Sequence, residues 1–495
     1  MMSTASSPVS AAPGKAFPVA IIFALIAALA IALMPTPSGL TIAGQRILAI
    51  LVFAVIVWLT EALDYAVSSV LIVALMALAL GTAPVGAAGE LLGTGKALGK
   101  ALSGFSNTAL ALVAAALFLS VAMTATGLDR RIAYRTLNRV GTTAKGVLLG
   151  GIAVTIILSL MVPSATARVA CVVPIMSGII AAFGVDKRSL FAASLMIVVA
   201  QATSIWNMGI MTSAAQNMLT IGFLQKSIGE TPSWADWLMA GAPYAAIMSA
   251  ALFILVRRLM PPEKESIEGG KEAVRQALSD MGPMSSAEWR VLITIALLIS
   301  FWVTEKELHD IDTTTVTIVG LAFLFLPRIG VMTWPQVQKQ VPWGTIVVFG
   351  VGISLGTALL DTKAATWLAD IVVRALHLET LGSFGIFAGL SLFLVLIHIG
   401  FASATSLTSA LLPIMIAVLQ RLGGDINVMG MTMLLGFVVS FGFILPINAP
   451  QNMVCLGTET FTSKQFTKIG LWLTGIGYIL LLVFALTWWK FLGYI

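Results

Sequence analysis

PSATARVACVVPIM, which runs from Pro163 to Met176, and ASATSLTSALLPIM, which runs from Ala402 to Met415, are two copies of one pattern. In each copy Ser-Ala-Thr is followed, after seven intervening residues, by Pro-Ile-Met. Both copies lie inside apolar sequence, where small hydroxylated residues and a proline inside a helix are costly unless a site needs them. The recurrence therefore predicts an internal repeat with a polar site in each half.

Two shorter patterns accompany this one in the same order. WLTE at 58–61 returns as WVTE at 302–305, and AAQNM at 214–218 returns as APQNM at 449–453. All three pairs are offset by about 240 residues, so each copy of the repeat covers roughly half of the chain. A single small-residue motif would be typical of ordinary helix packing in a membrane, and the shared order makes that interpretation less favoured here.

The composition indicates that the chain is surrounded by lipid. Hydrophobic residues make up 58% of the 495 residues and charged residues only 10%. Many apolar runs reach the roughly 18 residues that span a bilayer, and they are continuous rather than alternating, so we expect an all-α polytopic membrane protein and not a β-barrel. The basic residues behind the net charge of +6 are dispersed, so no nucleic-acid partner is predicted. Cys171 and Cys455 are interpreted as buried apolar residues.

The spans are placed by apolar runs between charges and turn residues. We expect about eleven transmembrane segments plus two re-entrant hairpins in inverted-topology repeats. The predicted parts are a disordered N-terminus (1–15), a first repeat (16–256) with scaffold helices, a hairpin (146–183) and a broken helix (190–224), a cytoplasmic linker (257–290), and a second repeat (291–495) with a hairpin (383–420), a broken helix (429–457) and a last helix (469–489).

The distribution of lysine and arginine tests this arrangement. With a cytoplasmic N-terminus and an outer C-terminus, about twice as many of these residues lie on the cytoplasmic side as outside, in agreement with the positive-inside rule. The hairpin around Ser164 then enters from the cytoplasm and the hairpin around Ser403 from outside, as in secondary transporters with inverted repeats. Two full spans in place of each hairpin give the same parity; hairpins are favoured because no polar loop surrounds either motif.

The motifs indicate what such a site could bind. A hairpin tip at Ser164 would present a helix N-terminus, with free N–H groups and hydroxyls, inside the protein, and such an end favours a carboxylate. The broken segments would supply unwound backbone carbonyls, which suit a small hard cation such as Na+. Two facing tips suit a ligand with a carboxylate at each end. The alternative is that the small residues serve only close helix packing.

Over nearly its whole length the chain resembles the divalent anion/sodium symporter (DASS) family of di- and tricarboxylate transporters and exchangers. The resemblance rests on the early WLTE, on the two tip triplets with Pro-Ile-Met downstream, and on ILPINAPQN at 444–452. It implies a homodimer in which a transport domain moves against a scaffold as an elevator. In this family the tip triplets bind substrate carboxylates and help to ligate Na+.

Carried onto this chain, the resemblance implies a set of site residues. The implied substrate contacts are Ser164, Ala165 and Thr166 at the first tip, Ser403, Ala404 and Thr405 at the second tip, and Asn207 and Asn448 at the broken helices. The candidate Na+ ligands are Ser164, Asn207, Ser403 and Asn448. The chain departs from the family triplet Ser-Asn-Thr, because alanine replaces asparagine in both copies. We hypothesise that Asn207 and Asn448 restore the lost amides.

Two ionisable residues inside the apolar sequence are further candidates. Arg168 lies one turn after Ser164, and an arginine within the membrane is a functional candidate by default. It could contact and balance a dianionic substrate, or hold the hairpin through backbone carbonyls; the second repeat has Leu407 there. His398, five residues before Ser403, could make transport sensitive to pH or be a satisfied core histidine.

We therefore expect a secondary active transporter of small di- or tricarboxylates, of the succinate, malate, 2-oxoglutarate and citrate class, with elevator-type alternating access and Na+-coupled symport. The alternatives are a dicarboxylate exchanger without sodium coupling, a carrier of another divalent oxyanion such as sulfate, a cation/proton antiporter and, least favoured, a passive channel. The sequence holds no phosphate loop, metal-ligand cluster or nucleophile–base pair, so we predict no enzyme and no cofactor besides Na+ as a coupling ion. The expected location is the cell inner (plasma) membrane, and the expected partners are the carboxylate, the lipid bilayer and a second copy of the chain.

Overall fold

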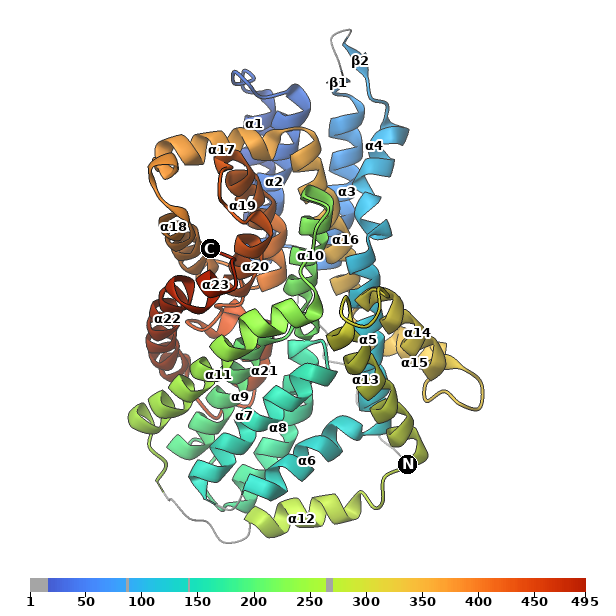
Figure 1. Cartoon of the computed structure of the whole chain (residues 1–495), viewed down its shortest axis with the longest axis vertical. Coiled ribbons are helices and arrows are strands. Elements are labelled where there is room, and N and C mark those ends of the chain that lie inside the picture. Colours follow the sequence, from blue (N-terminus) through green and yellow to red (C-terminus); the bar gives the residue numbers. More distant parts are fainter. Residues whose placement is uncertain (1–16, 86–88, 141–142, 264–269) are drawn as a thin grey trace.

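The computed structural model describes residues 17–85, 89–140, 143–263 and 270–495 (Figure 1). The expected disordered N-terminus (1–15) lies outside these described residues. Within them the regular structure is helical, apart from two strands of two residues each, β1 (Pro84–Val85) and β2 (Glu90–Leu91). Ten of the described helices are long and apolar enough to cross a membrane, and further apolar helices are shorter. The prediction of an all-α polytopic membrane protein is therefore confirmed.

The helices of the first half are α1 (Phe17–Leu33), α2 (Ile42–Thr60), α3 (Tyr65–Gly81), α4 (Thr94–Ala101), η1 (Ser103–Ser106), α5 (Thr108–Thr126), α6 (Leu128–Val140), α7 (Ala144–Met161), α8 (Ala165–Ala182), α9 (Leu190–Gly209), η2 (Met211–Ser213), α10 (Ala215–Ser227) and α11 (Trp234–Leu259). The predicted linker contains α12 (Gly270–Asp280). The helices of the second half are α13 (Ser286–Thr304), α14 (Thr313–Phe325), α15 (Trp334–Gln340), α16 (Trp343–Asp361), α17 (Ala364–Ala375), η3 (Leu378–Thr380), α18 (Ser383–His398), α19 (Ala404–Leu422), α20 (Val428–Val438), η4 (Pro446–Asn448), α21 (Pro450–Leu456), α22 (Ser463–Leu486) and α23 (Trp488–Phe491).

Short polar residues set the points at which the apolar runs begin as helices. The side chains of Thr41, Thr143 and Ser189 accept hydrogen bonds from backbone N–H groups in the first turns of α2, α7 and α9. At α11 and α13 the cap is reciprocal, because a serine is paired with an acid three residues later. The first N–H groups of a helix have no partner inside it, so each cap contributes about 1 kcal/mol.

The WLTE and WVTE motifs occupy equivalent places in the two halves. Trp58 Nε1 on α2 donates to Ser68 Oγ on α3 at 3.2 Å, and Trp302 Nε1 on α13 donates to Thr317 Oγ1 on α14, also at 3.2 Å. Each tryptophan is buried between its two helices. This echo of the sequence is therefore a packing motif, in which a buried indole N–H finds a hydroxyl partner on the next helix.

Each half contains one helical hairpin and one interrupted helix. In the first half, α7 and α8 meet at Ser164, and α9 and α10 are separated by residues 210–214, which are not α-helical. In the second half, α18 and α19 meet at Ser403, and α20 and α21 are separated by residues 439–449. These two interruptions, called the helix breaks below, leave backbone carbonyls without a helical partner.

A glycine on α11 allows that helix to approach the last turn of α9, just before the first break, and a glycine on α22 allows that helix to approach the second break. A Cβ atom at Gly241 on α11 would collide with the backbone oxygen of Met208, and one at Gly470 on α22 would collide with the backbone oxygen of Phe443. The backbones can approach this closely only because the glycines have no side chain. Irregular backbone in a membrane is tolerated where protein encloses it, and these contacts provide that enclosure.

The two halves are hydrogen-bonded to one another at the breaks. Gln216 Nε2 on α10 donates to Ser440 Oγ at 3.1 Å, and Gln451 Nε2 on α21 donates to Ser204 Oγ on α9 at 3.0 Å. These are the glutamines of AAQNM and APQNM, and each reaches into the opposite half. In Figure 1, α21 accordingly lies against α8 and α9. The repeated motif thus joins the halves into one unit.

A buried ion pair holds α6 against the start of α13. Arg131 Nε donates to Glu288 Oε1 at 2.5 Å, and only 5% and 3% of the two side chains are exposed. The same guanidinium donates to the backbone oxygens of Met281 and Gly282. The segment that connects α12 to α13 is therefore fixed on α6.

Replacing Arg131 with methionine should destabilise the protein by about 3–5 kcal/mol, because the Glu288 carboxylate would remain buried without its partner. Thermal unfolding of the detergent-solubilised protein measures this loss. The matched control is Lys100→Met, which removes an ion pair with Asp361 whose side chains are 48% exposed each. That control should cost no more than about 1 kcal/mol. Equally small losses in both variants would contradict the expectation.

Candidate functional site

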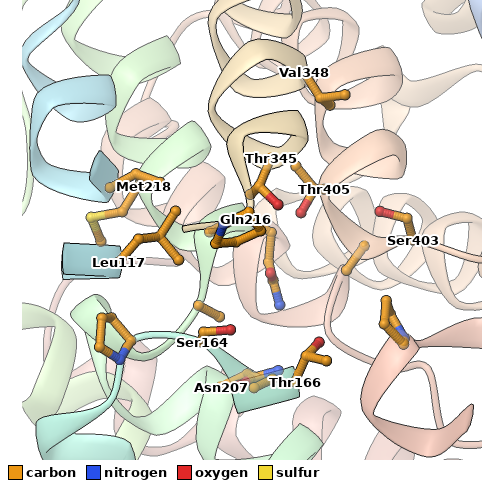
Figure 2. Close-up of a pocket in the computed structure, with 18 of the residues that line it drawn as sticks. Leu117, Ser164, Thr166, Asn207, Gln216, Met218, Thr345, Val348, Ser403 and Thr405 are labelled. Carbon is orange, nitrogen blue, oxygen red and sulfur yellow. The ribbon is translucent and has the colours of Figure 1, made fainter. Parts of the chain in front are cut away.

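A cavity of about 320 Å³ lies where the two halves meet. It is lined by the tips of both hairpins, by residues of both helix breaks and by the start of α16. Figure 2 shows Ser164 and Thr166 of the first tip on one side of the cavity and Ser403 and Thr405 of the second tip on the other side. Segments about 240 residues apart in the sequence therefore form one site.

Each tip presents the first turn of a long helix to the cavity. α8 has 18 residues and α19 has 19. Ser164 Oγ accepts a hydrogen bond from Ala167 N, and Ser403 Oγ accepts one from Ser406 N, both at 3.3 Å. Because the serine oxygens act as acceptors here, their hydroxyl hydrogens remain able to donate to a ligand. Together with the partial positive charge of a helix N-terminus, this chemistry suits an anionic group.

The cavity collects seven of the nine residues expected to contact substrate. Ser164, Ala165, Thr166, Asn207, Ser403, Ala404 and Thr405 line it, whereas Arg168 and Asn448 are not among its lining residues. Among the four candidate Na+ ligands, Asn448 is likewise outside the lining. The structure brings the two tip triplets together, and the binding role of each residue stays a prediction.

The side-chain amide of Asn448 makes its hydrogen bonds to backbone groups at the second hairpin and the second break. Its Nδ2 donates to the carbonyl oxygens of His398, Ile399 and Phe401, each at 3.0 Å, and its Oδ1 accepts from Leu445 N at 3.0 Å. The side chain is 1% exposed. An amide with its donor and acceptor both used has little left for a ligand, so the structure makes Asn448 a support of the hairpin.

Arg168 takes the corresponding place behind the first hairpin. Its Nη1 donates to Val162 O at 2.8 Å and to Ser213 O at 2.7 Å, which links the end of α7 to the first break. Its Nη2 donates to Asn207 Oδ1 at 2.5 Å. The side chain is fully buried. These contacts are those of the alternative in which Arg168 holds backbone carbonyls, and Arg168 reaches the cavity only through Asn207, which lines it.

The asparagines of the AAQNM and APQNM motifs donate to further carbonyls in and beside the breaks. Asn217 Nδ2 donates to Asn207 O at 2.7 Å and also reaches the carbonyls of Ile210 and Met211. Asn452 Nδ2 donates to Gly442 O at 2.9 Å. The asparagine has the same role in both copies of the motif, which is to donate to backbone carbonyls near a helix break. The sequence showed that the residue is repeated, and the structure shows why.

Some polar lining residues lie outside the repeated motifs. Asp64, Tyr65 and Thr345 reach the cavity from the starts of α3 and α16. Tyr65 Oη donates to Glu61 Oε1 at 3.2 Å, and its hydroxyl lies beside Ser403. The WLTE motif ends at Glu61, four residues before Tyr65, so the motif lies close to the site in the sequence. Hydropathy alone does not assign Tyr65 to a binding site.

No group of three His, Cys, Asp or Glu side chains in the described residues is arranged to hold a metal ion. His398, buried behind the second tip, has Nε2 3.4 Å from Asn448 O. A Na+ ion would therefore depend on hydroxyl and carbonyl oxygens. Arg168 already donates to Val162 O at the end of α7 and to Ser213 O in the first break, and Asn448 donates to three carbonyls at the second hairpin.

Known proteins resemble this chain in sequence and in fold. The sequence model of a family described as sodium:sulfate symporter transmembrane region matches residues 16–495. A Cupriavidus necator protein named only as a membrane protein is 62% identical over 476 residues, covering 96% of this chain and 93% of that protein. The sodium-dependent dicarboxylate transporter SdcS of Staphylococcus saprophyticus is 26% identical, with 91% of this chain and 87% of the transporter covered. The crystal structure of the Alcanivorax borkumensis YdaH transporter has a similar fold, with a TM-score of 0.56 at 15% identity over 85% of this chain and 97% of that one.

Asn448→Ala should destabilise the protein by about 2–5 kcal/mol, because three carbonyls at the end of α18 would lose their shared donor in a buried place. Thermal unfolding without added ligand measures this. Thr405→Ala is the control: its hydroxyl lines the cavity and has no hydrogen-bond partner within the described residues, so it should cost no more than about 1 kcal/mol. A stable Asn448→Ala variant that fails only in ligand binding would make Asn448 a substrate contact instead.

Proposed function

Since the chain belongs to the sodium:sulfate symporter transmembrane family, and is therefore a multi-span membrane transporter, we propose that it is a secondary carrier of small di- or tricarboxylates. It works by alternating access, in which one substrate site is exposed first to one side of the membrane and then to the other. Catalysis is not part of this function, because the family and the named relatives are transporters.

The meeting of the two hairpin tips in one cavity carries this proposal. Each tip offers a helix N-terminus and two hydroxyls, and the tips come from opposite halves of an internal repeat. In secondary transporters with inverted repeats, interrupted helices of this kind bind anionic substrate groups near the middle of the bilayer. A cavity of about 320 Å³ is in the range of small-molecule sites.

A carboxylic acid with groups at both ends fits the two tips better than a compact tetrahedral anion does. The name of the SdcS relative supports dicarboxylates. The description of the family supports sulfate as the second candidate. Because sulfate has one centre of charge, it would engage a single tip, and the second triplet would then have no purpose.

For the driving force, the geometry favours exchange without sodium coupling over the Na+ symport expected from the sequence. In a Na+ site of this type, unwound carbonyl oxygens ligate the ion. Here Ser213 O in the first break and Val162 O at the end of α7 accept hydrogen bonds from Arg168 Nη1, and three oxygens at or just after the end of α18 accept from Asn448 Nδ2. A carbonyl oxygen has two lone pairs, and a donor that takes one of them lowers the availability of that oxygen to Na+.

The resemblance to the family also supports an elevator-type movement within a homodimer in the plasma membrane. The Gln216–Ser440 and Gln451–Ser204 hydrogen bonds favour a transport unit in which both hairpins and both helix breaks move together. The charge distribution favours a cytoplasmic N-terminus and an outer C-terminus.

Full-length protein in proteoliposomes loaded with succinate should take up external labelled succinate by saturable counterflow. Replacing external Na+ with K+ should change the initial rate by less than about twofold, because protein donors occupy the carbonyls. Protein-free liposomes are the control. A strict requirement for Na+ would favour symport, uptake without saturation would favour a channel, and transport of sulfate in place of succinate would favour an oxyanion carrier.

Thr166→Val and Thr405→Val should each weaken succinate uptake by about tenfold or more, because each removes one hydroxyl donor to a charged group without changing side-chain shape. The concentration for half-maximal uptake is measured. Thr155→Val is the matched control, since that hydroxyl bonds Ile152 O within α7 at 2.7 Å and does not line the cavity. Wild-type affinity in both tip variants would remove the tips from the binding site.

A further inference from the structure

The two tips differ in charge although their sequences match. Behind the first tip the donor to the hairpin carbonyl is the guanidinium of Arg168. Behind the second tip the donor is the neutral amide of Asn448, and the position equivalent to Arg168 is Leu407. Both donors are buried. A positive charge therefore stands behind the first tip alone.

That charge has no counter-charge in the part of the chain that the structure describes. The three acceptors of Arg168 are the uncharged oxygens of Val162, Ser213 and Asn207, and its Nε has no described hydrogen-bond partner. A fully buried charge that no opposite charge balances costs several kcal/mol. An anion in the neighbouring cavity would reduce that cost, so binding of an anion at this end is favoured.

Asn207 transmits the effect of Arg168 to the cavity wall. A guanidinium can only donate, so the atom of Asn207 that faces it at 2.5 Å is Oδ1. The other amide atom, Nδ2, has no described hydrogen-bond partner, although the residue is only 3% exposed and lines the cavity. In Figure 2, Asn207 lies beside Ser164 and Thr166. Arg168 thus orients a free N–H donor next to the first tip.

The surroundings of the second tip have the opposite character. Tyr65, whose hydroxyl lies beside Ser403, is hydrogen-bonded to the carboxylate of Glu61. The adjacent Asp64 also lines the cavity, and no lysine or arginine of the described residues does. Because like charges repel, this end accommodates a second full negative charge less well than the first end accommodates one.

We propose that the cavity recognises the two ends of its substrate differently: it requires a carboxylate at the first tip and accepts an uncharged polar group at the second. The site then takes four-carbon monocarboxylates that carry an amide or hydroxyl at the far end, as well as dicarboxylates. This inference rests on the proposed carboxylate transport and narrows its chemistry.

Competition against labelled succinate uptake by the full-length protein tests the proposal, with succinate, its monoamide succinamate and its diamide succinamide as competitors. The assay is run at pH 8, where a histidine side chain with an ordinary pKa is uncharged. Succinamate should inhibit at a concentration within about tenfold of that of succinate, and succinamide should be at least about 100-fold weaker. Succinamate as weak as succinamide would overturn the proposal while leaving carboxylate transport intact, whereas absence of succinate uptake would overturn both.

Asn207→Asp supplies a variant that keeps the shape of the site and changes its charge. The new carboxylate would pair with Arg168, so the melting temperature without ligand should stay within a few degrees of wild type. Inhibition by succinate should weaken by at least about 100-fold, because the pair is neutral and the Nδ2 donor is gone. Retention of the wild-type order and strength of the three competitors would show that Arg168 does not act on the site.

Thr405→Val is the matched control at the second tip. Its hydroxyl serves the end that accepts either group, so it should weaken succinate and succinamate by the same factor. If inhibition by succinate weakened much more than inhibition by succinamate, the second tip would also bind a carboxylate specifically, and the proposal would be overturned.

Discussion

Backbone carbonyls that the helix breaks expose inside the membrane are the constraint on which this structure depends. Lipid offers them no hydrogen bonds, so each must find a donor within the protein. Asn217 and Asn452 supply one donor at each break, and their motif is repeated because the need is repeated. Gly241 allows α11 to pack on the end of α9 beside the first break, and Gly470 allows α22 to pack on the second break.

The hairpins meet the same need in two different ways. In the first half a guanidinium bridges the end of α7 and the break, and in the second half an amide collects three carbonyls at the end of α18. Either group satisfies the backbone, but only the guanidinium adds a charge. The two hairpins are therefore held by groups of different charge, and this makes the electrostatics of the cavity different at its two ends. Asn207 lies between Arg168 and the cavity.

Transport by such a site requires that its parts stay together while the molecule rearranges. The glutamines of the repeated motif cross from each half to the other, so the broken helices that form the cavity are bonded as a pair. Arg131 and Glu288 fix the connection between the halves on α6. In the proposed exchanger, Arg168 moves together with the binding site. Its positive charge would then accompany the bound anion in both directions across the membrane, without a coupling cation from solution.

The sequence by itself determined the membrane class, the internal repeat and the two polar tips. Continuous apolar runs indicate membrane-spanning helices, and polar residues inside such runs indicate a buried polar site. It also singled out Ser164, Thr166, Ser403 and Thr405, and all four line one cavity in the structure. Only the tertiary structure decided that Asn448 turns to the hairpin backbone, that Arg168 faces Asn207, and that Tyr65 joins the cavity wall. Hydrogen bonds between segments far apart in the chain settle those roles, and neither hydropathy nor spacing specifies which carbonyl a buried donor will reach.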